Sequence, residues 1–160
     1  MRGLRALAVA LVTGLACVAV AADGGRAAVV CPAATAWTPL PIADSGGLSS
    51  VAALSAGDAW AVGGGSDALA EHWDGSGWSA VATPPAASLP FLYSVTAVAS
   101  DDVWAVGSDL DGGAMEALVE HWDGARWEIV PTPPLVGLSG LFAVDAVAAD
   151  DVWAVGVRRD

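Results

Sequence analysis

The chain has 160 residues, of which 55% are hydrophobic and 15% are charged, a composition that argues against intrinsic disorder. Six arginines stand against 18 aspartates and glutamates, lysine is absent, and the net charge is −12. Binding to nucleic acid phosphates or to an anionic membrane surface requires clustered Lys or Arg side chains. The composition therefore excludes a nucleic-acid-binding surface, and the length is that of one ordinary domain.

The N-terminus has the pattern of a secretory signal peptide. Arg2 and Arg5 form a short positively charged region, and Ala6–Ala16 is an uncharged apolar run. Ala19-Val20-Ala21 supplies the small-x-small motif of a cleavage site. We predict a signal peptide over residues 1–21 and a secreted, extracellular protein.

Export would place the mature chain in an oxidising compartment. Cleavage after Ala21 would leave Cys31 as the single cysteine, either a spare thiol or a partner in intermolecular pairing. Two alternatives to a cleaved leader stay open. One is an N-terminal membrane anchor, and the other is a lipoprotein acylated on Cys17.

After an N-terminal segment over residues 22–47, the rest of the chain consists of repeats. Trp60, Trp104 and Trp153 are equivalent positions, and an insertion at Asp109–Met115 lengthens the second unit. A period of 40 to 50 residues with short strands is typical of β-propeller blades. The units cover residues 48–84, residues 92–133 and, incompletely, residues 141–160.

Each unit is expected to contain four short strands. Apolar runs bounded by Gly, Asp and Pro predict strands, and Asp-Gly between two such runs predicts a hairpin. The second strand is expected to end at a glycine, which is Gly63, Gly107 or Gly156. The expected strands are Ser50–Leu54, Ala59–Val62, Ala68–Trp73 and Trp78–Ala82; Ser94–Val98, Val103–Val106, Ala117–Trp122 and Trp127–Val130; and Ala143–Val147 and Val152–Val155.

These units resemble kelch-type repeats of galactose-oxidase-like propellers. Trp60-Ala61-Val62-Gly63-Gly64 is similar to the kelch aromatic strand that ends in a glycine doublet. His72-Trp73-Asp74-Gly75, followed by Trp78, is similar to the kelch Tyr-Asp-x-x-x-x-Trp stretch, with His-Trp in place of the tyrosine. The units also resemble the DVWAVG and HWDG repeats of uncharacterised secreted bacterial proteins.

The predicted fold class is all-β, a partial β-propeller of about two and a half four-stranded blades after an N-terminal signal peptide. Propellers close with four to eight blades. The segment Ala36–Pro41 resembles a fourth strand and is a candidate for ring closure. Three hypotheses explain why fewer blades are present than a closed ring needs. The chain is truncated, or it forms a homo-oligomer that completes the propeller, or it forms a small open sheet.

The repeats contain acidic residues and histidines that could form a metal or catalytic site. Glu71, His72 and Asp74 recur as Glu120, His121 and Asp123, and Asp58 recurs as Asp102 and Asp151. Equivalent positions in packed sheets lie about 10 Å apart, which is too far to share one zinc ion. We therefore predict structural roles for these groups and no catalytic residue, metal or cofactor.

Binding residues are expected where the repeats lose their symmetry. The candidates are Phe91, Tyr93, Asp109 and Asp111, the last two in an insertion that is either a flexible loop or a weak calcium loop. Tyr93 is the only tyrosine, whereas a copper-radical oxidase like galactose oxidase needs two tyrosine ligands. That activity is not supported.

The predicted function is a secreted, non-enzymatic binding or interaction scaffold that uses its loops. Its partner would be a protein or a carbohydrate at the cell exterior. The alternatives are a fragment of a larger propeller enzyme, such as a glycoside-active hydrolase or lyase, and a non-functional gene fragment.

Overall fold

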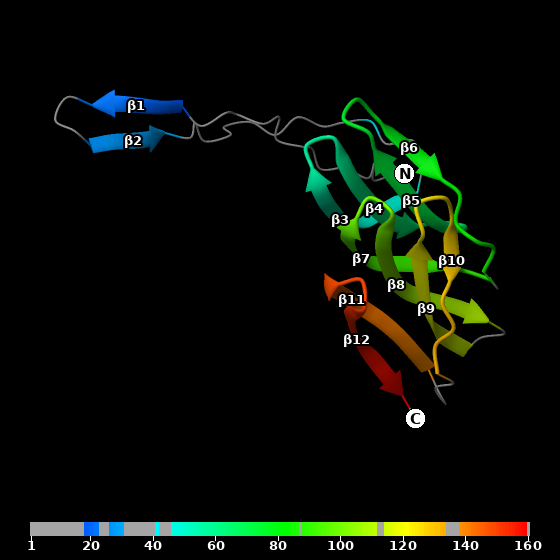
Figure 1. The fold of residues 1–160 in the computed structure, drawn as a ribbon. Helices are drawn as coiled ribbons and strands as arrows, with labels where there is room; N and C mark the ends of the chain where they lie inside the picture. The colour runs from blue at the N-terminus through cyan, green and yellow to red at the C-terminus, as the bar shows by residue number, and fades with distance from the viewer. Residues whose placement is uncertain are drawn as a thin grey trace, which may run out of the picture. The chain divides into compact units, whose positions relative to one another are not determined.

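The computed structural model describes residues 18–22, 26–30, 41, 46–86, 88–111, 114–133 and 138–159. The chain divides into two compact units, Met1–Pro41 and Ile42–Asp160, and every regular element in the described residues is a β-strand (Figure 1). This confirms the all-β class. No helix long and apolar enough to span a membrane occurs in this part of the chain.

In the first unit, β1 (Val18–Ala22) pairs with β2 (Arg26–Val30) in an antiparallel ladder. Val and Ala make up nine of the ten strand residues, and the β-branched valines favour extended backbone. The sequence had predicted the end of a leader here and no strand pair, so this ladder was missed. Most of the predicted signal peptide, Cys31 and residues 36–40 of the candidate closing strand lie outside the described residues.

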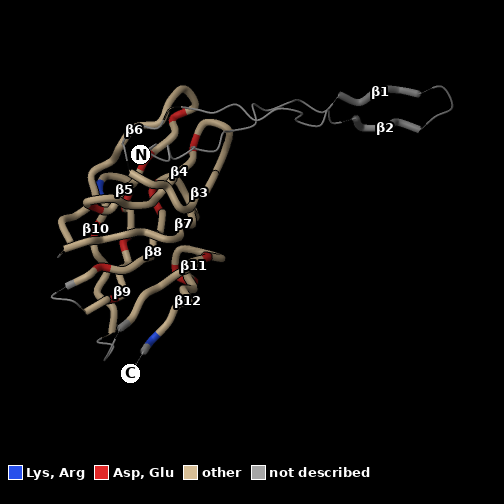
Figure 2. Tube along the Cα trace, turned by 180° about the vertical axis from the view of Figure 1, so that it is seen from behind, with Lys and Arg blue, Asp and Glu red and all other residues tan. Residues whose placement is uncertain are grey.

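The second unit contains three antiparallel sheets, each with its strands in chain order. The first and second sheets have four strands, and the third has two. Acidic residues are scattered over all three sheets, and basic ones are few (Figure 2). The first sheet is β3 (Gly47–Ser55), β4 (Asp58–Gly64), β5 (Ala68–Trp73) and β6 (Trp78–Val81); the second is β7 (Phe91–Ala99), β8 (Asp102–Asp111), β9 (Ala114–Trp122) and β10 (Trp127–Ile129); the third is β11 (Leu138–Ala148) and β12 (Asp151–Arg159).

All ten strands predicted for the repeats are present, but the insertion at Asp109–Met115 does not form the expected loop. Asp109 pairs with Glu116 and Leu110 with Met115, so β8 and β9 continue their ladder through most of the insertion. A ladder satisfies the backbone hydrogen-bonding groups that an open loop would leave to water. The added residues therefore lengthen a hairpin.

The prediction that a glycine ends the second strand was also wrong. Gly63, Gly107 and Gly156 lie inside β4, β8 and β12, each opposite a register shift in the neighbouring strand. A Cβ atom at Gly107 would lie 1.9 Å from the carbonyl oxygen of Phe91. The glycine is required because the bulged partner strand approaches the backbone too closely for any side chain.

The three sheets pack in sequence, because β3 and β4 contact β7, and β11 contacts β7, β8 and β9 (Figure 1). Trp60 and Val62 of β4 form one core cluster with Leu92, Val95 and Val103 of the second sheet. Ala61 of β4 points to the opposite face and is also buried. This explains the continuous apolar sequence of β4, since a strand covered on both faces has no polar side.

Serine hydroxyls link the first strands of successive sheets. The backbone N–H of Val95 donates to Ser50 Oγ at 3.2 Å, and that of Val144 donates to Ser94 Oγ at 3.2 Å. Ser50 and Ser94 occupy the same repeat position, and Ala143 is their equivalent in β11. The same hydrogen bond thus joins both pairs of neighbouring sheets, while β11 carries no hydroxyl at this position.

Candidate interaction surfaces

The repeated aspartates after β5 and β9 form turns. Asp74 Oδ1 accepts hydrogen bonds from the N–H groups of Ser76 and Gly77, at 2.8 and 3.0 Å, and from the Ser76 hydroxyl at 2.7 Å. The Ser76 hydroxyl, together with these backbone donors, lowers the pKa of Asp74 to about 2. Asp123 accepts from the corresponding backbone N–H groups of the second hairpin. These carboxylates are occupied by their own turns.

The repeated histidines bind aspartates within their own sheets. His72 Nε2 lies 2.9 Å from Asp58 Oδ1, and His121 Nε2 lies 2.8 Å from Asp102 Oδ1. The Ser100 hydroxyl of the second sheet also donates to Asp58, and it is the main cause of the lowered pKa of that carboxyl, followed by His72. No group of three or more metal-ligating side chains occurs among the described residues.

The glutamates that precede these histidines are fully buried. Glu71 and Glu120 are 0% exposed. Neither carboxylate oxygen of Glu120 has a hydrogen-bond partner among the described residues, and burial raises its pKa to about 7. The alternation along Glu-His-Trp could have revealed this, since Glu must point to the face opposite His. The repeated motif alone groups Glu with His and Asp, and that grouping was wrong for Glu120.

The structure places the predicted binding residues on strands rather than in loops. Phe91 and Tyr93 lie on β7, where the ring of Tyr93 packs 5.1 Å from that of Phe91 and 5.3 Å from that of Phe142. Asp109 is buried on β8 and accepts hydrogen bonds from the N–H groups of Ser88, Leu89 and Leu110. Asp111 ends β8, and its side chain is not described. Asp109 is thus committed to holding the segment before β7.

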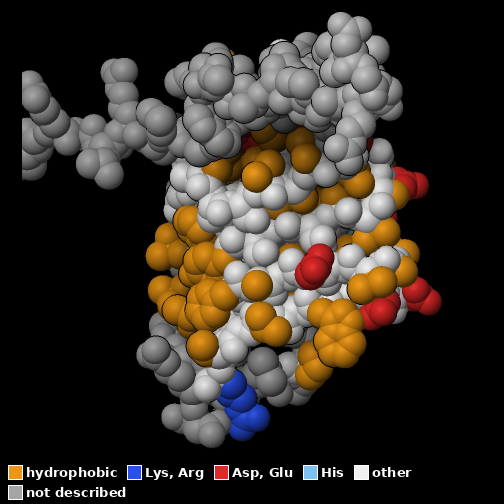
Figure 3. Space-filling model, turned by 90° about the vertical axis from the view of Figure 1, so that its left-hand side faces the viewer, with side chains coloured by type: hydrophobic (Ala, Val, Ile, Leu, Met, Phe, Trp, Pro, Cys, Tyr) orange, Lys and Arg blue, Asp and Glu red, His pale blue; other side chains and the backbone are white. Residues whose placement is uncertain are grey.

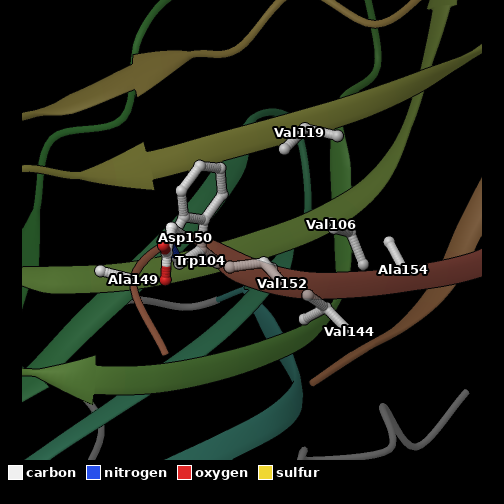
Figure 4. A pocket seen from close by; sticks show the side chains of 8 residues that line it. All are labelled: Trp104, Val106, Val119, Val144, Ala149, Asp150, Val152 and Ala154. Carbon is white, nitrogen blue, oxygen red and sulfur yellow. The ribbon is translucent and has the colours of Figure 1, made fainter. Parts of the chain in front are cut away.

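A hollow of about 310 Å³ lies between the second and third sheets. Figure 4 shows its lining side chains converging from β8 and β9 on one side and from β11 and β12 on the other. They are Trp104, Val106, Val119, Val144, Ala149, Asp150, Val152 and Ala154. This is an apolar groove with one tryptophan and one carboxylate, and the sequence did not predict it.

The corresponding space between the first and second sheets is filled. Trp60, the equivalent of Trp104, contacts the rings of Trp122 and Trp127, with centroid separations of 4.9 and 5.3 Å. Trp122 and Trp127 belong to the third and fourth strands of the second sheet. The third sheet has only β11 and β12 in the described residues, so the groove beside Trp104 lies where such rings would pack.

The outer face of the third sheet exposes large apolar side chains. Trp153 is 68% exposed and Val155 is 64% exposed, although the equivalent Trp60 and Val62 of β4 are buried. Figure 3 shows that hydrophobic side chains lie in separate groups on the face it draws, the largest of them along one side of the view. Below, the term outer face refers to the surface that the exposed side chains of Trp153 and Val155 form on the third sheet. Contiguous apolar patches larger than a few hundred Å² are typical of interaction sites on folded proteins.

Comparison of the sequence with models of known families gives no match. No curated protein is similar to the chain in sequence.

Proposed function

We propose that the chain is a secreted, non-enzymatic scaffold of β-propeller-type repeats that binds a protein at the cell exterior. The outer face carries this proposal. Trp153 and Val155 are at repeat positions that are buried core in the first sheet, yet they are mostly exposed here. Exposed Trp beside aliphatic side chains is suited to a protein partner, because aromatic anchors dominate such interfaces.

The propeller part of the proposal rests on the repeated packing of the sheets. Two successive pairs of sheets use the same serine-to-backbone hydrogen bond. Propellers are built from four-stranded antiparallel sheets repeated around an axis, and the first and second sheets each have four strands. The repeated aspartates and histidines already have hydrogen-bond partners in their own turns and sheets, which favours a structural role for them.

Binding through the outer face can be tested with arrays of purified cell-exterior proteins and glycans. The double variant Trp153→Ser/Val155→Ser is expected to bind its protein partner at least about tenfold more weakly, because a buried aromatic anchor is lost. Val51→Ser is the matched control, since Val51 is 65% exposed on the first sheet. Binding that is equally strong in both variants, or binding only to glycans, would contradict the proposal.

Secretion has a separate test. Mass spectrometry of the exported protein should find Ala22 as the first residue, since the predicted cleavage follows Ala21. A chain that retains Met1 in the membrane would support the anchor, and acylated Cys17 would support the lipoprotein.

A further inference from the structure

We propose that the interface between the first and second sheets contains a binding site for buried water, formed by the Glu120 carboxyl and the indole N–H groups of Trp60 and Trp127. The site lies in the interior of the second unit, so it does not rest on the proposed function. It follows from the burial of these polar groups, from their shared position between the sheets and from their hydrogen-bonding chemistry.

The three side chains carry buried polar atoms without hydrogen-bond partners. Both carboxylate oxygens of Glu120 and the Nε1 atoms of Trp60 and Trp127 are buried, and none of these four atoms has a partner among the described residues. Trp60 is 1% exposed, Trp127 is 4% exposed and Glu120 is 0% exposed. Buried polar groups in folded proteins nearly always bind another protein group or an ordered water molecule. The four atoms therefore indicate a bound molecule.

Other tryptophans of the repeats use their indole N–H groups within their own sheets. Those that donate to a carbonyl or carboxylate oxygen of the same sheet are Trp73, Trp104, Trp122 and Trp153. The two equivalents of Trp60 are among them, and each donates to the aspartate that begins its own strand. In the first sheet that aspartate, Asp58, binds His72 and Ser100 instead. The N–H of Trp60 thus lacks the acceptor that its equivalents use.

The three side chains meet between facing sides of the two sheets. Glu120 and Trp122 are two residues apart on β9, so they point to the same side of the second sheet. Trp127 lies directly opposite Trp122 on β10 and is therefore a diagonal neighbour of Glu120. Diagonal neighbours lie about 7–8 Å apart, a gap that a water molecule can bridge. Trp60 of the first sheet packs against both tryptophans, at centroid separations of 4.9 and 5.3 Å.

Short side chains beside Glu120 suit a site for water. Ala105 lies directly opposite Glu120 on β8, and Ala70 of the first sheet belongs to the same core cluster as Ala105. A buried water needs about 10–15 Å³ of accessible space and a few polar partners. The carboxyl and the two indole N–H groups supply these partners.

The chemistry of the three groups selects water over an ion. An indole N–H only donates, so the occupant must accept hydrogen bonds, which a metal cation cannot do. An anion would lie next to the Glu120 carboxyl, and the core cluster of described residues contains no Lys or Arg side chain. Water accepts from both indoles and can also bind the carboxyl, whether that carboxyl is ionised or protonated.

NMR spectroscopy of the whole chain tests the site through cross-peaks between water and the indole protons. Trp60 and Trp127 should both show NOESY and ROESY cross-peaks to water of opposite sign, which are typical of a long-lived bound water. Trp73 is the internal control and should show none, because its indole N–H donates to the carbonyl oxygen of Ala56. At pH 8 most of Glu120 is ionised, since its pKa is about 7, so its own proton cannot relay the signal.

Two substitutions then test whether Glu120 holds the water. Glu120→Met removes both oxygens at similar size and should abolish the cross-peaks of Trp60 and Trp127. Glu120→Gln is the matched control, because its amide oxygen still accepts a hydrogen bond, and it should keep them. An unchanged Trp73 resonance reports that each variant is folded.

The unmodified protein can overturn the proposal without any variant. Absence of the cross-peaks from either Trp60 or Trp127 would show that the two indoles do not share a bound water. Persistence of the cross-peaks in Glu120→Met would overturn the proposal too, because the signal would then come from another exchangeable proton, such as that of His72, which lies beside Trp60. Loss of the cross-peaks in Glu120→Gln would contradict the role of the Glu120 oxygen as an acceptor.

Discussion

Glu120 combines an ionisable side chain with a fully buried position. It lies opposite Ala105, and residues directly opposite in an antiparallel pair point to the same face. Ala105 belongs to the core cluster with Trp60 and Val62, so the Glu120 carboxyl faces the interior between the first and second sheets. A carboxyl in such a place stays protonated to a higher pH because burial disfavours its charged form.

The pH dependence of stability follows from this shift. The folded-state pKa of about 7 is higher than the reference value of 4.5, so the folded state holds its proton while the unfolded state loses it. The contribution of Glu120 to the free energy of unfolding should therefore fall as the pH rises from 4.5 to about 7, and then level off. The total fall is on the order of 3 kcal/mol.

The variant Glu120→Gln should remove most of this dependence and be more stable than the unmodified protein at pH 8. Urea titrations at several pH values measure it, with the exposed Glu116→Gln as the control. A stability profile of Glu120→Gln that parallels the original one would show that Glu120 is not protonated in the fold.

A second prediction at the scale of single residues concerns Gly107. A Cβ atom there would overlap the carbonyl of Phe91, so Gly107→Ala should lower the free energy of unfolding by about 1–3 kcal/mol or more. Gly77→Ala is the control, because its Cβ would have no atom within 4 Å, and the change should stay within about 0.5 kcal/mol. Thermal or urea unfolding distinguishes the two, and equal effects would contradict the close approach of β7 to β8.

At the scale of elements, contacts between neighbouring sheets depend on a few specific side chains. Ser94 is part of β7, and its hydroxyl accepts the N–H of Val144 in β11. Because β11 and β12 form a two-stranded sheet, their stability depends on docking against the second sheet. The third sheet is therefore expected to open before the other two.

Ser94→Ala tests this dependence. The loss of one partly buried hydrogen bond should cost about 1 kcal/mol and leave the Val144 N–H without its acceptor. Hydrogen exchange should quicken in β11 and β12 but remain unchanged in β4. Ser79→Ala is the control, since the exposed Ser79 hydroxyl bonds only within the first sheet. Equal exchange rates in both variants would mean that the serine does not hold β11.

At the scale of the whole molecule, the three sheets bury their facing sides unequally. Tryptophan side chains fill the space between the first and second sheets, whereas the outer face of the third sheet remains exposed. A net charge of −12 keeps copies apart, and exposed apolar surface draws them together. The balance between these effects depends on salt, because salt screens only the charge.

Weak self-association should therefore appear at high salt. Light scattering after size exclusion is expected to show a mass that rises with protein concentration in 1 M salt. At that concentration the Debye length is roughly three times shorter than at 0.1 M salt, so the repulsion between copies is screened. Trp153→Ser/Val155→Ser should suppress this rise, and Val51→Ser should not. A constant mass for the unmodified protein under these conditions would show that the outer face does not bind itself.

Much of the architecture was predictable because it is locally encoded. Alternating Val, Ala and Trp between Asp-Gly and Pro signals predicted all ten strands of the repeats, and β5 has the predicted limits. The turn role of the repeated aspartates followed from their spacing before glycine, as Asp74 shows. The period of a strand and the residues of a turn depend on neighbours in the sequence, so both can be predicted from a single sequence.

The sequence by itself determined the repeat, its strand order and its acidic, lysine-free composition. Only the tertiary structure decided that Gly107 lies inside a strand, that Glu120 is buried, that Asp109 holds the segment before β7 and that a groove remains beside Trp104. Each of these depends on atoms that lie far apart in the chain. Identical repeat positions such as Trp60 and Trp153 differ in exposure because packing between sheets, rather than local sequence, decides what covers each side chain.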